Sequence, residues 1–328
     1  MEPVQVVCAC NADYIMPLCT MVASLAEHFD PERDLVIHII SNDATAEHRE
    51  QVRQSIRLAG ADPGRVQLHW LSIDSALVED IHRREERFSP DVYVRLFAPS
   101  LLPESCERVV YLDCDLVVLA DISKLYDAAG DNPAVLHAVH DLAVPLVSSE
   151  SGVFDYQARG IPPDTRYFNS GVMVINLKKW RERDLTPPML SYARANGSQI
   201  HWVDQGVLNA FLHHDWVPLD ARWNQQTNIL YKERWTNNGY SIEEWKRVKN
   251  DPLIVHFSGP QKPWGARRRH FPRRIYFYQY LQKTVFRNSL PRYPYLESAM
   301  GTRAYYRLWK VVMTFYHLLW LRTSTQKI

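Results

Sequence analysis

The feature that most constrains the fold is an alternation, in the first third of the chain, of short β-branched runs with segments of helical length. The runs lie at 4–10, 35–40 and 66–71, and segments with helical periodicity separate them at 14–29 and 46–59. Strands separated by helices indicate a parallel sheet that is covered on both faces. Substrates of such sheets usually bind beyond the carboxyl ends of the strands, so the residues after each run are candidates for a site.

Length and composition fit an ordinary globular protein. The chain has 328 residues, 46% of them hydrophobic and 23% charged, which allows one large core or two modest ones and excludes a disordered or fibrous class. Residues 144–167 contain Pro and Gly and form a long loop of the kind that often covers a site. Further strands are expected at 109–112, 134–139, 171–175 and 253–256, and helices at 90–96 and 204–213.

The five cysteines all lie in the first 114 residues: Cys8, Cys10, Cys19, Cys106 and Cys114. No second Cys or His pair lies at zinc-site spacing from Cys8 and Cys10, so small buried side chains are favoured over a metal site. The first residues lack the basic and apolar regions of a signal peptide. We therefore expect reduced thiols in a cytoplasmic protein.

A pair of carboxylates follows the apolar run at 109–112. Side chains two residues apart in an extended chain point the same way, so Asp113 and Asp115 can face one ion. Paired oxygen ligands suit Mn²⁺ or Mg²⁺, with substrate phosphates completing the shell, and such an ion would neutralise a diphosphate leaving group. The alternative is a chance Asp-x-Asp in a turn, because the tripeptide alone is weak evidence.

Three further motifs accompany this pair. In chain order the four are YLDCD at 111–115, FNSG at 168–171, WVDQG at 202–206 and HFSGPQKPW at 256–264. Together they resemble the retaining glycosyltransferase family 8, which includes bacterial lipopolysaccharide α-galactosyl- and α-glucosyltransferases and, more distantly, glycogenin. The resemblance covers roughly residues 4–264, and four ordered motifs make coincidence a poor explanation.

The resemblance implies an α/β fold of the GT-A type, a Rossmann-like, mostly parallel sheet flanked by helices. A nucleotide-sugar half would occupy about 1–120, an acceptor half about 121–264, and a basic tail 265–328. The implied metal ligands are Asp113, Asp115 and His256, although a His in an apolar strand is more often a core residue. Gly259 would let the backbone approach a phosphate of the donor, and Lys262 would offer that phosphate a positive charge. Without the surrounding motif, Lys262 would be interpreted as a solvated surface lysine.

The donor sugar in this family is held by side chains that match Arg95, Asn169, Asp204 and Gln205. Their structural alternatives are a surface Arg, a turn Asn and a helix N-cap Asp. Nucleoside recognition would fall to the end of the first strand, and the implied nucleotide-sugar contacts there and in the metal motif are Ala9, Asn11, Tyr14 and Cys114. Asn11 stands where galactosyltransferase-like members carry an Asp that reads uracil, but an amide also donates and accepts.

Retention of the α-configuration constrains the mechanism. A double displacement needs a carboxylate near the anomeric carbon, and the nearest catalytic candidates are Asp204 and Gln205. We expect front-face attack, in which the leaving phosphate helps to deprotonate the acceptor hydroxyl. Asp141 matches a position that contacts the acceptor in the family, with a surface-loop Asp as the alternative.

The near-neutral net charge of +1 hides an uneven distribution. Residues 265–328 contain 13 lysines and arginines but one acid, Glu297, whereas residues 1–264 contain 25 lysines and arginines and 36 acids. Aromatic residues and cations surround the uncharged run 311–321, which is too short to span a bilayer but suits a helix in the headgroup region. We expect peripheral attachment to an anionic membrane surface, on the inner face of the cell membrane. A docking helix on the catalytic domain is the alternative, and the acidic body disfavours a nucleic-acid partner.

The expected activity is therefore metal-dependent transfer of galactose or glucose from a UDP-sugar to a hydroxyl of a cell-surface glycan or lipid-linked acceptor. Two other classes stay open from the residues alone. One is a sugar-nucleotide-binding protein without turnover, and the other is a different metal-dependent enzyme such as a nucleotidyltransferase. The sequence distinguishes neither galactose from glucose nor one acceptor from another.

Overall fold

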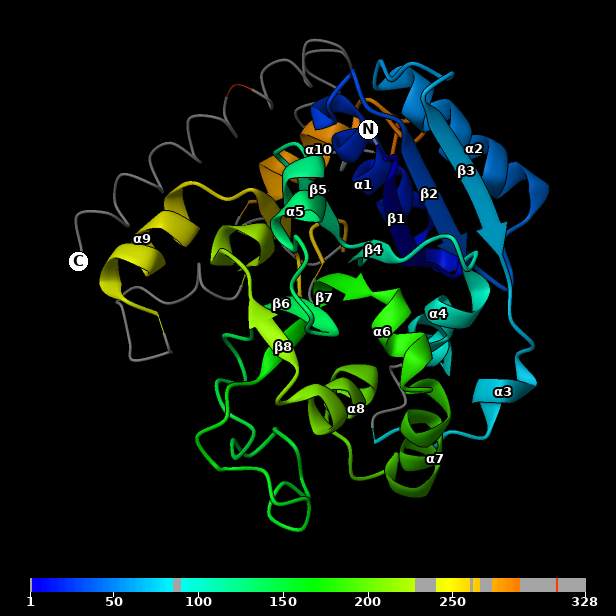
Figure 1. The fold of residues 1–328 in the computed structure, drawn as a ribbon. Helices are drawn as coiled ribbons and strands as arrows, with labels where there is room; N and C mark the ends of the chain where they lie inside the picture. Colours follow the sequence, from blue (N-terminus) through cyan, green and yellow to red (C-terminus); the bar gives the residue numbers. More distant parts are fainter. Residues whose placement is uncertain are drawn as a thin grey trace.

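The computed structural model describes residues 2–84, 90–227, 240–259, 262–265, 273–289 and 311. A seven-stranded sheet forms its centre, in the order β3-β2-β1-β4-β7-β6-β8 (Figure 1). The strands are β1 (Val4–Ala9), β2 (Leu35–Ile40), β3 (Val66–Leu71), β4 (Arg108–Leu112), β6 (Leu136–His140), β7 (Phe168–Asn176) and β8 (Trp216–Pro218).

Strands β1 to β4 run parallel to one another, as the alternation of runs and helices predicts. β8 is also parallel to β6, while β7 is antiparallel to both β4 and β6. The expected mostly parallel α/β sheet is thus confirmed, with one reversed strand inside it. Because β7 is reversed, its first residues lie at the same edge as the carboxyl end of β4, where the backbone of Asp113 donates to the carbonyl of Gly171 (2.9 Å).

Each face of the sheet has its own hydrophobic core, because neighbouring side chains of a strand point to opposite faces. In β1, Val6 and Cys8 belong to one core and Val7 to the other. The first core includes α1 (Ile15–His28), α2 (Ala46–Leu58) and α5 (Ser123–Ala128). The second includes α3 (Ala76–Glu79), the 3₁₀ helix η2 (Pro90–Phe97), α4 (Ala98–Leu101), α6 (Leu177–Glu182), α7 (Thr186–Asn196) and α8 (Val203–Leu212).

A second sheet of three short strands was not expected. It contains β5 (Leu116–Val118), β10 (Ile254–His256) and β9 (Gln225–Gln226), which follows the 3₁₀ helix η3 (Ala221–Asn224). Antiparallel pairing sets His256 opposite Leu116, and the backbone of Phe257 donates to the carbonyl of Asp115 (2.9 Å). The small sheet therefore holds His256 next to the Asp-x-Asp turn, although more than 100 residues separate them in the chain.

Residues beyond Trp264 also belong to the folded unit. Helix α10 (Arg274–Leu281) contacts α1, and its Phe277 and Leu281 are buried against Val117 and Val255 of the small sheet. Arg267–Arg269, 290–310 and 312–328 lie outside the described residues, and with them most of the proposed membrane-binding tail. No helix among the described residues is both long and apolar enough to cross a membrane.

The segment between β6 and β7 contains neither helix nor strand, only an isolated bridge between Leu146 and Arg166. It is the long green loop at the bottom of Figure 1. Helix α9 (Ile242–Asn250) contacts η3 and begins with a capping box between Ser241 and Glu244.

Candidate active site

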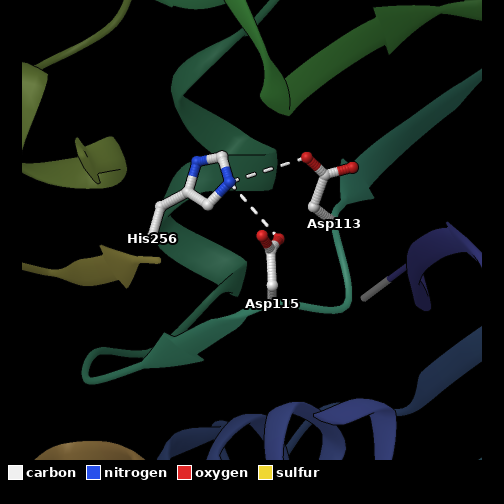
Figure 2. Close-up of side chains that lie close together, drawn as sticks. All are labelled: Asp113, Asp115 and His256. Atoms are coloured by element: carbon white, nitrogen blue, oxygen red, sulfur yellow. Dashed lines mark ion pairs between the residues drawn. The ribbon is translucent and has the colours of Figure 1, made fainter. Parts of the chain in front are cut away.

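Asp113, Asp115 and His256 converge at the carboxyl edge of β4, as Figure 2 shows. The Nε2 atom of His256 lies 3.3 Å from Asp115 Oδ1 and 3.6 Å from Asp113 Oδ2. One ligand atom from each residue lies within 4.8 Å of the other two. The sequence prediction that these three residues form one cluster is met by the geometry, and two carboxylates with an imidazole can hold a divalent metal ion.

The other carboxylate oxygen of Asp113, Oδ1, already has two partners. Asp113 Oδ1 accepts from the Tyr111 hydroxyl (3.1 Å) and pairs with the Arg95 guanidinium (3.0 Å), which also lies over the Tyr111 ring. Tyr111 and Asp113 share a side of the extended chain, so the tyrosine can reach the carboxylate two residues on. These contacts turn Oδ2 toward His256 and hold the carboxylate in place.

A chain of hydrogen bonds fixes the tautomer of His256. The Gly171 backbone N–H donates to Asn169 Oδ1 (3.0 Å), which also accepts from Asn224 Nδ2 (2.8 Å). Asn224 Oδ1 therefore faces His256 Nδ1 (2.9 Å), and the imidazole must donate there. In the neutral ring the lone pair is then on Nε2, directed at two carboxylates, which is the arrangement of a metal ligand supported by a hydrogen bond on its other nitrogen.

The same network extends to the predicted acceptor residue. Asn169 Nδ2 donates to Asp141 Oδ2 (2.9 Å) and to Gln205 Oε1 (3.1 Å), and Gln205 Nε2 donates to Asp141 Oδ2 (3.1 Å). All three side chains are buried, so none is a loose surface group. The other oxygen of Asp141 accepts from the backbone of Ala143 and Val144, which ties it to the start of the long loop.

Arg95 joins Asp204 to the cluster of Asp113, Asp115 and His256. Its Nε lies 3.1 Å from Asp204 Oδ2, which also accepts from the Ser170 hydroxyl (3.2 Å). Burial raises the pKa of Asp204 to about 6, against the opposing charge of Arg95. Burial lowers the pKa of Arg95, but the charges of Asp113 and Asp204 outweigh it and raise that pKa above its usual value. Arg95 is thus a buried bridge between two acids and not a surface arginine.

The N-cap interpretation of Asp204 is wrong. The N-cap of α8 is Trp202, and Asp204 lies in the first turn with its carboxylate directed to Arg95 and Ser170. Between them Val203 adopts a φ of +38°, a conformation that β-branched residues rarely take. This backbone presents Asp204 and Gln205 together toward the start of β7.

Lys262 pairs with Oδ2 of Asp115, whereas His256 faces Oδ1, and it donates to the Phe257 carbonyl (3.0 Å). Burial raises the pKa of Asp115, but Lys262 and His256 outweigh that effect and hold the pKa below its usual range. Gly259 has a φ of +88°, so the backbone conformation itself favours glycine. Apart from its chain neighbours, none of the described residues has an atom within 4 Å of where its Cβ would be.

The nucleoside residues lie at the adjacent end of β1. The Cys114 thiol donates to the carbonyl of Ala9 (3.2 Å), which joins the Asp-x-Asp turn to this strand. Asn11 Oδ1 is buried and has no partner among the described residues. Tyr14 meets the Trp264 ring edge-on, with centroids 6.0 Å apart, so it lies beside the segment that carries Lys262.

The structure therefore joins every predicted metal and sugar residue into one network, with the nucleoside residues next to it. Sequence reasoning missed Tyr111, Gly171 and Asn224 as parts of the site. A Cβ on Gly171 would lie 2.3 Å from His256 Cε1 and 2.7 Å from Asp113 Oδ2, so this glycine is required by close packing. Gly171 and Tyr111 lie inside the FNSG and YLDCD motifs and could have been found there. For Asn224 the only sequence feature that could have identified it is the short, mostly polar run Trp223–Gln226.

Comparisons with known proteins agree with the geometry. A family model described as glycosyl transferase family 8 matches residues 5–267. General stress protein A of Bacillus subtilis is 29% identical over 287 residues, covering 86% of this chain and 94% of that protein. A lipopolysaccharide 1,2-glucosyltransferase of Escherichia coli is 31% identical over 207 residues, covering 62% of this chain and 58% of that protein.

The solved structure of the galactosyltransferase LgtC in complex with donor and acceptor sugar analogues superposes with a TM-score of 0.71, at 23% identity, over 88% of this chain and 100% of that chain. The GT-A fold expected from the motifs is therefore confirmed. The family match spans most of the chain and contains every residue of the site. The chain belongs to glycosyl transferase family 8 and is an enzyme that transfers sugar.

Proposed function

We propose that the enzyme transfers galactose or glucose from a UDP-sugar to an acceptor hydroxyl with retention of the α-configuration. The proposal includes a Mn²⁺ or Mg²⁺ ion held by Asp113, Asp115 and His256. The observation that carries it is the hydrogen-bond chain that holds His256 Nδ1 against Asn224 and turns Nε2 toward two carboxylates. One imidazole nitrogen and two carboxylate oxygens lie within 4.8 Å of one another, and this donor set fits a bound divalent metal ion.

A metal ion at this position would supply positive charge to the donor diphosphate as its bond to the sugar breaks. Lys262 adds a second positive charge on the Asp115 side. Arg95 pairs with both Asp113 and Asp204 and offsets part of their negative charge, which would otherwise oppose an anionic donor. Arg95 and Lys262 therefore offset only part of the negative charge of Asp113, Asp115 and Asp204, and a divalent cation would offset the rest.

A uridine donor is supported by the end of β1. The buried Asn11 oxygen without a partner suits a base N–H donor, and Tyr14 offers an aromatic surface beside it. For the sugar, Asp204, Gln205 and Asn169 provide buried groups that can orient hydroxyls. The lipopolysaccharide glucosyltransferase relative and the LgtC galactosyltransferase support a hexose donor and a cell-surface glycan or lipid-linked acceptor.

Retention requires attack from the face on which the diphosphate leaves, or a covalent intermediate. Asp204 is already engaged by Arg95 and Ser170, and the Gln205 amide is engaged by Asp141 and Ser170. Both are therefore better suited to positioning than to nucleophilic attack. We propose front-face attack, in which Asp141 contacts the acceptor and the leaving phosphate receives the proton of the acceptor hydroxyl.

We further propose that the basic residues of 265–328 attach the enzyme to an anionic membrane surface on the cytoplasmic face. The charge asymmetry of the sequence supports this placement, and a lipid-linked acceptor would be found there. Nothing in the acidic body suits a nucleic-acid partner.

Hydrolysis of a panel of UDP-sugars in the presence of Mn²⁺ tests the proposal, since it identifies the donor without knowledge of the acceptor. UDP-galactose or UDP-glucose is expected to be cleaved faster than UDP-N-acetyl sugars or other nucleotide sugars. Cleavage of nucleoside triphosphates would contradict the proposal. So would a rate of UDP-sugar hydrolysis that stays the same after a chelator has removed the divalent metal.

A further inference from the structure

A second cavity opens at the carboxyl ends of β6 and β8, and it lies outside the network of the metal site. Its volume is about 270 Å³, and its wall combines residues that follow β8 with residues of α9 and the loop residue Arg166. One lining residue, His140, is the direct neighbour of Asp141 in the chain. The cavity is therefore one residue along the chain from the proposed acceptor contact.

His140, one of the lining residues, carries a hydrogen-bond acceptor that is unused among the described residues. Its Nε2 donates to the carbonyl of Pro145 (2.7 Å), so in the neutral ring Nδ1 carries the lone pair. Nδ1 is buried and has no partner among the described residues, and the side chain as a whole is 4% exposed. Burial lowers the pKa of His140, which favours this neutral form. A buried acceptor without a partner is costly, and a hydroxyl donor from a ligand would satisfy it.

The charged groups of the wall are balanced. Arg247 pairs with Asp220 (3.1 Å), which Arg222 also binds, and Glu244 accepts from the backbone of Ser241. Arg166 is exposed and makes no ion pair with any residue that the structure describes. Two cations and two carboxylates repel a phosphate as much as they attract it. A ligand with several hydroxyls can accept from the arginines and donate to His140 and the acids.

The remaining wall suits the apolar face of a sugar ring. Pro218, Leu219 and Val248 contribute aliphatic surface, and Tyr240 contributes an aromatic side chain that packs edge-on against His140. A volume of about 270 Å³ is near the lower end for small-molecule pockets, which suits a group of the size of one monosaccharide.

We propose that this cavity binds a sugar unit of the acceptor glycan, other than the unit that receives the transferred sugar. The inference rests on the proposed function, because it assumes a glycan acceptor. Hydrogen bonds from Tyr240 and Gln226 to the carbonyl of His140 link the cavity wall to the segment before Asp141. The acceptor would thus be held on both sides of this short segment, which would select for acceptors longer than one sugar.

Binding of galactose, lactose, glucose, maltose and maltotriose to the full chain tests the subsite, measured by saturation-transfer NMR. At least one of the oligosaccharides should bind about tenfold more tightly than its monosaccharide. Arg166→Ala and Arg247→Ala should reduce that oligosaccharide's affinity to the level of the monosaccharide. Arg53→Ala, an exposed arginine on α2 across the sheet, is the matched control and should change nothing.

Three results would overturn the subsite. In the first, the wild-type protein binds none of the sugars or binds all of them with equal affinity. In the second, the variants bind the oligosaccharide with the affinity of wild type. In the third, inorganic phosphate displaces the sugar from wild type but not from Arg166→Ala. UDP-sugar hydrolysis by the same wild-type preparation separates the two proposals. If the donor is hydrolysed and any of these results is found, only the subsite fails, whereas absence of hydrolysis counts against the proposed function.

Discussion

Asn224 is 1% exposed and joins two parts of the candidate site that the sequence separates, the FNSG motif and His256. In Asn224→Ala the His256 ring loses the acceptor that fixes its tautomer, and Asn169 loses a donor. We expect the affinity for Mn²⁺, measured by electron paramagnetic resonance, to fall by about 10- to 100-fold. Asn288→Ala removes an exposed amide and serves as the control. Wild-type Mn²⁺ affinity in Asn224→Ala would contradict the assigned role.

Gly171 has a second kind of role, which is steric. Gly171→Ala places a methyl group inside contact distance of both His256 and Asp113. We expect a loss of about 1–3 kcal/mol in the free energy of unfolding, together with weaker Mn²⁺ binding, because the two ligands must move apart. Urea denaturation and the same resonance titration measure the two effects. Gly64→Ala, where the added methyl meets a movable aspartate side chain, is the control. Unchanged metal binding would show that the ligands tolerate the displacement.

Most of the candidate site could be predicted from the family resemblance, because its residues stand in short motifs. Asp113 and Asp115 are also recognisable as a pair from the residues alone, whereas His256 and Lys262 are implied only by the resemblance. Asn224 could not be predicted in this way, because its function depends on a hydrogen-bond chain between segments far apart in sequence. The wrong N-cap assignment of Asp204 has a similar cause, since its partner Arg95 lies more than 100 residues earlier.

At the scale of elements, the pairing of β2 with β3 makes stability depend on pH. Register sets His38 opposite His69, and the two rings stack with centroids 5.3 Å apart. Burial, with the charge of His69, lowers the pKa of His38 to about 4 in the folded protein, against about 6.5 in the unfolded chain. Between these values only the unfolded chain holds the proton. The stability contribution is therefore present above pH 6.5 and is lost as the pH falls toward 4.

We expect this histidine to account for a loss on the order of 2 kcal/mol in the free energy of unfolding between pH 6.5 and 4. Urea denaturation at a series of pH values should give a flatter curve for His38→Leu than for wild type. Parallel curves for the two proteins would mean that His38 is not the group responsible.

Elements with strong local patterns could be predicted closely, and those without them could not. The residue bounds of β2 and β3 agree with the predicted runs, because their apolar or alternating residues face packed helices or neighbouring strands. The direction of β7 did not follow from its residues, since an apolar strand buried on both faces reads the same in either direction. Strands β5 and β9 are three and two residues long, too short for any periodicity to identify.

At the scale of the molecule, the basic tail predicts association with anionic lipid. Vesicles containing phosphatidylserine should bind the full chain more strongly than neutral vesicles, by roughly 1 kcal/mol per contacting cation, and high salt should weaken the binding. A chain ending at Ser289 keeps α10 and its buried side chains but lacks the later cations, and should lose most of this binding. Equal flotation of the two chains with anionic vesicles would contradict the membrane proposal.

The central claim is that Asp113, Asp115 and His256 hold a divalent ion on which cleavage of the donor depends. Its most direct test is hydrolysis of UDP-galactose and UDP-glucose as a function of Mn²⁺ concentration, in wild type, Asp113→Asn and Asp115→Asn. We predict saturable dependence on Mn²⁺ in wild type and a rate at least about 100-fold lower in each variant, with the folded state intact by circular dichroism. Full, metal-independent hydrolysis in either variant would contradict the account.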